Sequence, residues 1–191
     1  MYDVISFLDK EISQILNNDH NFDSLSKEMC FACSNIASGP LRFKLQLLQR
    51  GIVQKVLSLV QLDTKVQVNN FYIKTIREIA SFCCNLLEGA SLELITELYN
   101  LHLLVYLSNW LNFKDTDTLK YCLKGIEILL DYGDKVREIN NYGINFVKEE
   151  MENNGDQQTL VKLQYSNVKC IYDLVEDILH KYFKSDDIIE A

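Results

Sequence analysis

Long runs rich in apolar residues alternate with short polar segments along the chain, and this pattern predicts helices joined by loops. The first group predicts helices at 26–38, 43–50 and 52–62, and a late one spans 168–183. One proline and seven glycines interrupt the sequence, whereas an all-β fold needs many tight turns. The pattern therefore favours an all-α fold, with loops at the polar stretches "NNDHNFDS", "LDTKVQVNN", "FKDTDT" and "ENNGDQQ".

One helical segment recurs fifty residues later in the chain. "KEMCFACSNIASG" starts at Lys27, and "REIASFCCNLLEG" starts at Arg77 with glutamate, asparagine and glycine at matching places. A weaker third copy, "LKGIEILLDYG", starts at Leu123. Units of about 42 to 50 residues with three helices are typical of armadillo and HEAT solenoids. We therefore predict a right-handed armadillo superhelix of three to four repeats.

The repeats divide the chain into one domain, 1–191, with units at about 1–62, 63–111, 112–152 and 153–185 and an acidic tail at 186–191. Four glycines are expected at the helix junctions. Gly39 and Gly89 are predicted as left-handed helix caps, because glycine adopts that conformation without steric cost. Gly51 and Gly143 are predicted at the tight bend between the first and second helices.

Composition and net charge limit the classes of partner that the protein is expected to bind. The chain has 191 residues, 48% of them hydrophobic, which suits one compact domain. Its net charge of −8 disfavours nucleic acid and anionic membrane, which both reward a basic face, and favours a basic partner. No run approaches the ~20 apolar residues of a membrane helix. Acids within the first apolar run of "MYDVISFLDKEISQ" argue against a signal peptide.

Six cysteines raise the question of a metal or redox site. Cys30 and Cys33 have the spacing of a zinc knuckle, but no second such pair and no paired histidines accompany them. The same spacing describes neighbours on one helix face, where free cysteine packs as a small hydrophobe. We expect reduced thiols and no zinc or other cofactor. Because no phosphate-binding or hydrolase motif occurs, we also expect that the protein is not an enzyme.

The segment "KEMCFACSNIASG" resembles a third armadillo helix of the importin-α family of nuclear-import adaptors. The family pattern of Lys-Glu-Ala-Cys-Trp, then Ser-Asn and Gly, is matched at Lys27, Glu28, Cys30, Asn35 and Gly39, with phenylalanine in place of tryptophan. The C-terminal stretch that ends "DILHKYF" beside an acidic tail resembles the family's last repeats. The resemblance implies a C-terminal portion of such an adaptor, in cytoplasm and nucleus.

In that family, the third helices line a groove for basic nuclear-localisation peptides. Asparagine holds the peptide backbone, an aromatic ring covers a Lys or Arg side chain, and carboxylates pair with the charged tip. Here the ring positions carry Phe31 and Ser81, and Lys124 and Ile128 occupy the third unit. The predicted peptide-binding residues are Glu28, Phe31, Asn35, Glu78, Ser81 and Asn85.

Other interpretations of these residues stay open. Phe31 also suits a core position, and Asn35 and Asn85 could bridge neighbouring repeats. Glu28 and Glu78 could be solvated acids near a helix N-terminus. An armadillo scaffold without cargo-peptide binding is therefore the alternative function. Further expected partners are importin-β and the export receptor of importin-α. Self-association is also expected, through an apolar N-terminal edge exposed by truncation.

Overall fold

The computed structural model describes residues 4–17, 24–60, 70–141 and 143–183. The predicted acidic tail, most of "LDTKVQVNN" and most of "NNDHNFDS" lie outside these residues. The described part holds no strand and contains α1 (Val4–Asn17), α2 (Ser24–Ala37), α3 (Leu41–Gln49), α4 (Ile52–Ser58), α5 (Asn70–Leu87), α6 (Leu92–Asn100), α7 (Leu103–Trp110), α8 (Thr116–Asn140), α9 (Phe146–Asn154), α10 (Asp156–Leu163), α11 (Lys169–Ile178) and a π-helical turn, η1 (Leu179–Phe183).

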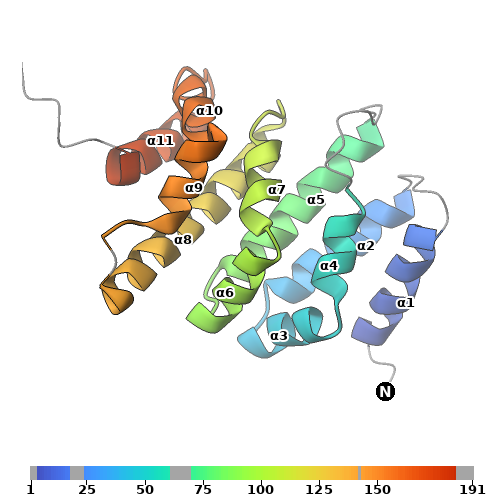
Figure 1. Cartoon of the computed structure of the whole chain (residues 1–191). Helices are drawn as coiled ribbons and strands as arrows, with labels where there is room; N and C mark the ends of the chain where they lie inside the picture. The colour runs from blue at the N-terminus through green and yellow to red at the C-terminus, as the bar shows by residue number, and fades with distance from the viewer. Residues whose placement is uncertain (1–3, 18–23, 61–69, 142, 184–191) are drawn as a thin grey trace, which may run out of the picture.

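The helices form a curved stack that runs from α1 at one end to α11 at the other (Figure 1). The long third helices make up one row, in which α2 packs on α5, α5 on α8, and α8 on α11. The shorter first and second helices of each repeat, such as α6 and α7, lie beside this row (Figure 1). The all-α prediction is confirmed. Two of the predicted unit boundaries fall before α5 and α8, and the third, between residues 152 and 153, falls inside α9.

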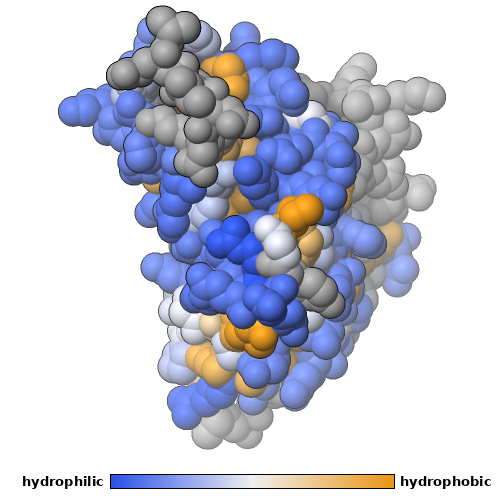
Figure 2. All heavy atoms as spheres, turned by 60° about the vertical axis from the view of Figure 1, so that its left-hand side comes forward, coloured by the Kyte–Doolittle hydropathy of each residue, from blue (hydrophilic) through white to orange (hydrophobic). Residues whose placement is uncertain are grey.

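A continuous apolar core runs along the stack. The third helices contribute fully buried residues such as Ile76 and Phe82. The sole tryptophan, Trp110, lies at the end of α7 and is 2% exposed, so it packs in the core. The surface at the end of the stack formed by α9–α11 is mainly hydrophilic, with only small apolar patches (Figure 2). A polar surface of this kind is typical of the capping units of solenoids.

The cysteines behave as core residues. Five of the six are buried in the third helices, and all six are free. Burial raises the pKa of Cys84 to about 11 and that of Cys33 to about 12. A thiol with such a pKa stays protonated at neutral pH and is a poor nucleophile. The described residues contain no group of histidine, cysteine and carboxylate side chains arranged to hold a metal ion.

The structure corrects two of the four glycine positions predicted at the helix junctions. Gly51 has a positive φ of 70° at the α3–α4 bend, as predicted, and Gly89 has the predicted left-handed conformation after α5. The equivalent bend between α9 and α10 uses Gly155, with φ of 80°, and not Gly143, which precedes α9. Gly39 is not left-handed either. An added Cβ there would lie 2.9 Å from the Phe43 ring, so close packing explains this glycine.

The α6–α7 bend leads to a stability prediction. His102 has φ of 60° and ψ of 31°, a left-handed conformation that strains any residue with a Cβ, and it is exposed. We expect His102→Gly to raise the free energy of unfolding by about 0.5–1 kcal/mol, after the entropy cost of glycine is subtracted. Urea unfolding measures this change. His102→Ala is the control, because it keeps the strain; equal stability of the two variants would contradict the prediction.

Candidate peptide-binding face

The exposed sides of α2, α5 and α8 form one surface, which we call the third-helix face. On α2 it carries three of the predicted binding residues. Phe31 has 47% of its surface exposed, so it lies on this face and not in the core. Asn35 is also exposed. The Glu28 carboxylate is exposed and lies 2.8 Å from the Lys27 ammonium. The three side chains share one side of α2, as their i, i+3, i+7 spacing requires.

On α5, the matching residues are only half exposed because α2 packs beside them. The hydroxyls of Ser81 and Ser34 lie 2.9 Å apart and share a hydrogen bond. The side-chain amide of Asn85 donates to the Ser34 carbonyl at 3.1 Å and to the Ser34 hydroxyl at 3.0 Å. Asn85 therefore bridges neighbouring third helices, which is the alternative role considered for it. Ser34 was not among the predicted residues, although the family-like Ser-Asn pair contains it.

Glu78 supplies the second carboxylate of the face. Burial raises its pKa, and the nearby charges of Lys27 and Arg77 oppose that rise. It lies close enough to Glu28 for the two charges to repel, since the Glu28 carboxylate also contributes to the raised pKa. Two carboxylates on the same face as an exposed ring are the groups that attract a cationic side chain.

A buried lysine supports the α5 end of this face. Lys44 on α3 is 4% exposed, and its ammonium donates to the backbone carbonyls of Asn85 and Glu88. The Asn85 carbonyl belongs to the last turn of α5 and Glu88 directly follows the helix, where backbone carbonyls lack a partner within the helix. Burial lowers the pKa of Lys44. Sequence reasoning missed this residue, because only its place within the apolar helix "LRFKLQLLQ" distinguishes it from a surface lysine.

On α8 the chemistry of the face changes. Lys124 is exposed and Ile128 is half buried, so the predicted ring position of the third unit carries a lysine in place of an aromatic ring. The side of α8 that faces α5 is anchored by Arg77, whose guanidinium donates through two nitrogens to the Asp115 carboxylate. The Nε–Oδ2 distance in this pair is 2.9 Å. The predicted groups that attract a cation therefore lie on α2 and α5, and Lys124 on α8 carries the opposite charge.

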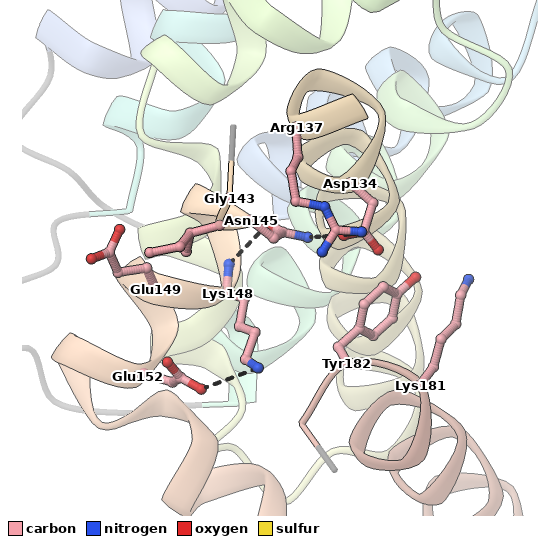
Figure 3. Close-up of a pocket in the computed structure, with 10 residues that line it drawn as sticks. Asp134, Arg137, Gly143, Asn145, Lys148, Glu149, Glu152, Lys181 and Tyr182 are labelled. Atoms are coloured by element: carbon pink, nitrogen blue, oxygen red, sulfur yellow. Dashed lines mark hydrogen bonds and ion pairs between the residues drawn. The ribbon is translucent and has the colours of Figure 1, made fainter. Parts of the chain in front are cut away.

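A charged cleft of about 360 Å³ lies at the far end of α8, between α9 and η1 (Figure 3). Its cations are paired with acids. Arg137 lies 3.2 Å from Asp134, and Lys148 lies 3.7 Å from Glu152. Lys181 lies 2.7 Å from Asp131, which also accepts a hydrogen bond from the Tyr182 hydroxyl at 2.7 Å. These contacts fasten η1 to α8, and the cleft offers little unbalanced charge to a ligand.

The comparisons with known proteins show the fold. No family model matches the chain, and no curated protein matches it. Several solved structures do. A designed armadillo repeat protein in complex with the peptide (KR)4 matches with a TM-score of 0.67 and 22% identity, over 92% of this chain and 63% of that one. Another, computationally designed for modular peptide recognition, matches with a TM-score of 0.70 and 20% identity, over 93% and 64%.

The fold is an armadillo-repeat α-solenoid. The chain spans less than two thirds of the length of these designed proteins. Sequence identities of 20–22% show that the architecture is shared and no more. The resemblance to importin-α therefore stays a prediction. None of the described helices is long and apolar enough to span a membrane.

Proposed function

We propose that the third-helix face binds an extended basic peptide, as an adaptor of the importin-α type does with nuclear-localisation signals. The observation that carries this proposal is the exposed ring of Phe31, flanked on the same face by the carboxylates of Glu28 and Glu78. A lysine side chain laid over the ring would have its ammonium within reach of a carboxylate. A designed protein of this fold has been solved with a peptide of alternating lysine and arginine, which supports a basic ligand here.

The adaptor role implies further properties. The protein would act by binding and not by catalysis. It would shuttle between cytoplasm and nucleus, and its partners would include cargo proteins, importin-β and the export receptor of importin-α. Self-association through the N-terminal edge is part of the proposal. Apolar side chains on α1 and α2 support it, since Val4 is 61%, Phe7 47% and Leu25 44% exposed.

The second candidate function is an armadillo scaffold that binds proteins without a cargo-peptide site. Two observations favour it. The amide of Asn85, which would hold the peptide backbone in an adaptor, donates to Ser34 of the neighbouring helix. The exposed Lys124 on α8 would repel a basic peptide that continued beyond α5.

Titration of a fluorescent lysine-rich peptide distinguishes the two functions. If the face binds basic peptides, affinity should be micromolar and should fall as salt is added. Phe31→Ala should weaken binding by about two- to thirtyfold, which corresponds to about 0.5–2 kcal/mol for a cation–π contact. The matched control is Phe7→Ala, because Phe7 is equally exposed but lies on α1. Absence of binding, or equal losses in both variants, would leave the scaffold function.

A further inference from the structure

A second cleft, of about 350 Å³, lies where α7 ends and where α8 and α11 begin, with α10 as its fourth side. We call it the α7–α11 cleft. It lies at the junction of the last two repeats and shares no lining residue with the predicted peptide-binding residues. Half of its lining residues are apolar and come from α8, α10, α11 and the connections beside them: Leu111, Phe113, Leu119, Leu163, Val168 and Ile171.

The polar part of the lining is positively charged, although the chain as a whole is negatively charged. The chain carries 27 acids and 19 lysines and arginines, yet the residues that line this cleft include Lys114 and Lys162 and no acid. Both lysines are exposed, and neither takes part in the ion pairs found in the described part of the chain. The charged cleft beside η1 differs, because its lysines and arginine are paired.

The acids nearest to Lys114 in the sequence are already engaged. Asp115 accepts from Arg77 and from Thr118, while Asp117 lies 3.4 Å from Lys120. Neither lysine of the cleft therefore has an acid partner among the ion pairs of the described residues. An apolar cavity bordered by two unpaired ammonium groups is complementary to an apolar side chain with carboxylates beside it.

The apolar surface extends outside the cavity. Val168, which precedes α11 and lines the cleft, is 39% exposed, and Tyr165 in the same α10–α11 connection is 83% exposed. A cavity at the lower end of the usual ligand range, about 300–1,000 Å³, combined with an exposed apolar border, suits a few side chains of a protein segment better than an enclosed small molecule.

We propose that the α7–α11 cleft binds an acidic–apolar segment of a partner protein. One or two apolar side chains of the segment fill the cavity, and the flanking carboxylates pair with Lys114 and Lys162. This site is distinct from the third-helix face and prefers the opposite charge. The protein would then bring a basic segment and an acidic–apolar segment together on one solenoid.

The test uses a fluorescent peptide with the core Asp-Asp-Leu-Leu-Asp-Asp, titrated against the whole chain and followed by anisotropy. We expect micromolar affinity at low salt. The same peptide with asparagine in place of aspartate should bind about tenfold more weakly, and serine in place of leucine should also reduce binding about tenfold. A lysine-rich peptide should not compete. No binding of the acidic–apolar peptide, or full displacement by the lysine-rich peptide, would overturn the proposal.

Variants locate the site. Lys162→Glu should weaken binding about tenfold, whereas Lys135→Glu, an equally charged change at an exposed position of α8 outside the cleft, should change it less than about twofold. Val168→Ser should weaken it about threefold while supplying a favourable cap for α11. Equal effects of Lys162→Glu and Lys135→Glu would show attraction to net charge alone and would exclude this cleft as the site.

Discussion

Replacing Gly133 with alanine is expected to lower the free energy of unfolding by about 2–4 kcal/mol. Gly133 is buried within α8, where the helical conformation itself would accept alanine. The cost comes from Asn145, the residue before α9. A Cβ at position 133 would lie 2.0 Å from the Asn145 side-chain oxygen and 2.7 Å from its Cγ, far inside van der Waals contact.

Asn145 cannot move away without losing its hydrogen bonds. Its side-chain oxygen accepts from the backbone N–H groups of Val147 and Lys148 at 3.0 and 3.1 Å, which caps α9. Its amide donates to the Leu130 carbonyl at 2.8 Å and to Asp134 at 3.0 Å. Asn145 is 3% exposed, so water would not replace these partners. Loss of a cap alone costs about 1 kcal/mol, and buried unpaired polar groups add about 1–3 kcal/mol.

Urea unfolding of Gly133→Ala measures the loss, and hydrogen exchange should show that α9–α11 open first. Gly143→Ala is the matched control, because Gly143 has no atom within 4 Å of an added Cβ and no positive φ, and it should change stability little. Adding Asn145→Ser to Gly133→Ala should recover part of the loss, because serine caps α9 with a shorter side chain. Similar stabilities of the two glycine variants would refute the clash.

Gly133 also shows where sequence comparison reached its limit. It is the last residue of the weaker third copy, "LKGIEILLDYG", in the place that Gly39 and Gly89 hold in the first two copies. In the structure α8 continues to Asn140, and Asn141 adopts the left-handed conformation with φ of 54°. The missing side chain at position 133 leaves the space that the Asn145 side chain occupies. A contact between residues in different helices leaves no trace in local spacing, so the repeat pattern predicted the element but not its length.

On the third-helix face too, the sequence predicted what depends on spacing within one helix and missed the contacts between helices. Helical periodicity placed Glu28, Phe31 and Asn35 on one side of α2, because that property depends only on spacing along one helix. The bridge from Asn85 to Ser34 and the support from Lys44 join residues 51 and 41 positions apart. Such contacts depend on how the repeats pack. The fold was therefore predictable from periodicity, and the partners of the site residues were not.

Replacing Asp115 with asparagine is expected to cost about 2–3 kcal/mol at pH 7. Asp115 precedes α8, and its carboxylate accepts from the Thr118 backbone N–H at 3.0 Å, from the Thr118 hydroxyl at 2.7 Å and from the Arg77 guanidinium. It therefore caps α8 and fastens that helix to α5. Asparagine keeps part of the cap but loses the charge that Arg77 requires.

The pH dependence of this loss identifies its cause. Burial alone would raise the pKa of Asp115, but the hydrogen bonds from Arg77 and Thr118 outweigh it and lower the pKa to about 2. A lowered carboxyl pKa stabilises the fold above the unfolded-state pKa of about 3.9, and this stability is lost as the pH falls towards 2. The difference in unfolding free energy between wild type and Asp115→Asn should therefore be constant above about pH 5 and shrink between about pH 4 and pH 2.

Urea titrations at a series of pH values give this difference directly. Asp117→Asn is the control. The Asp117 carboxylate is 52% exposed and 3.4 Å from Lys120, and a surface pair of this kind contributes less than about 1 kcal/mol. Its variant should match wild type within about 0.5 kcal/mol at every pH. A loss in Asp115→Asn that persisted unchanged at pH 2 would mean that the carboxylate charge held by Arg77 is not its cause.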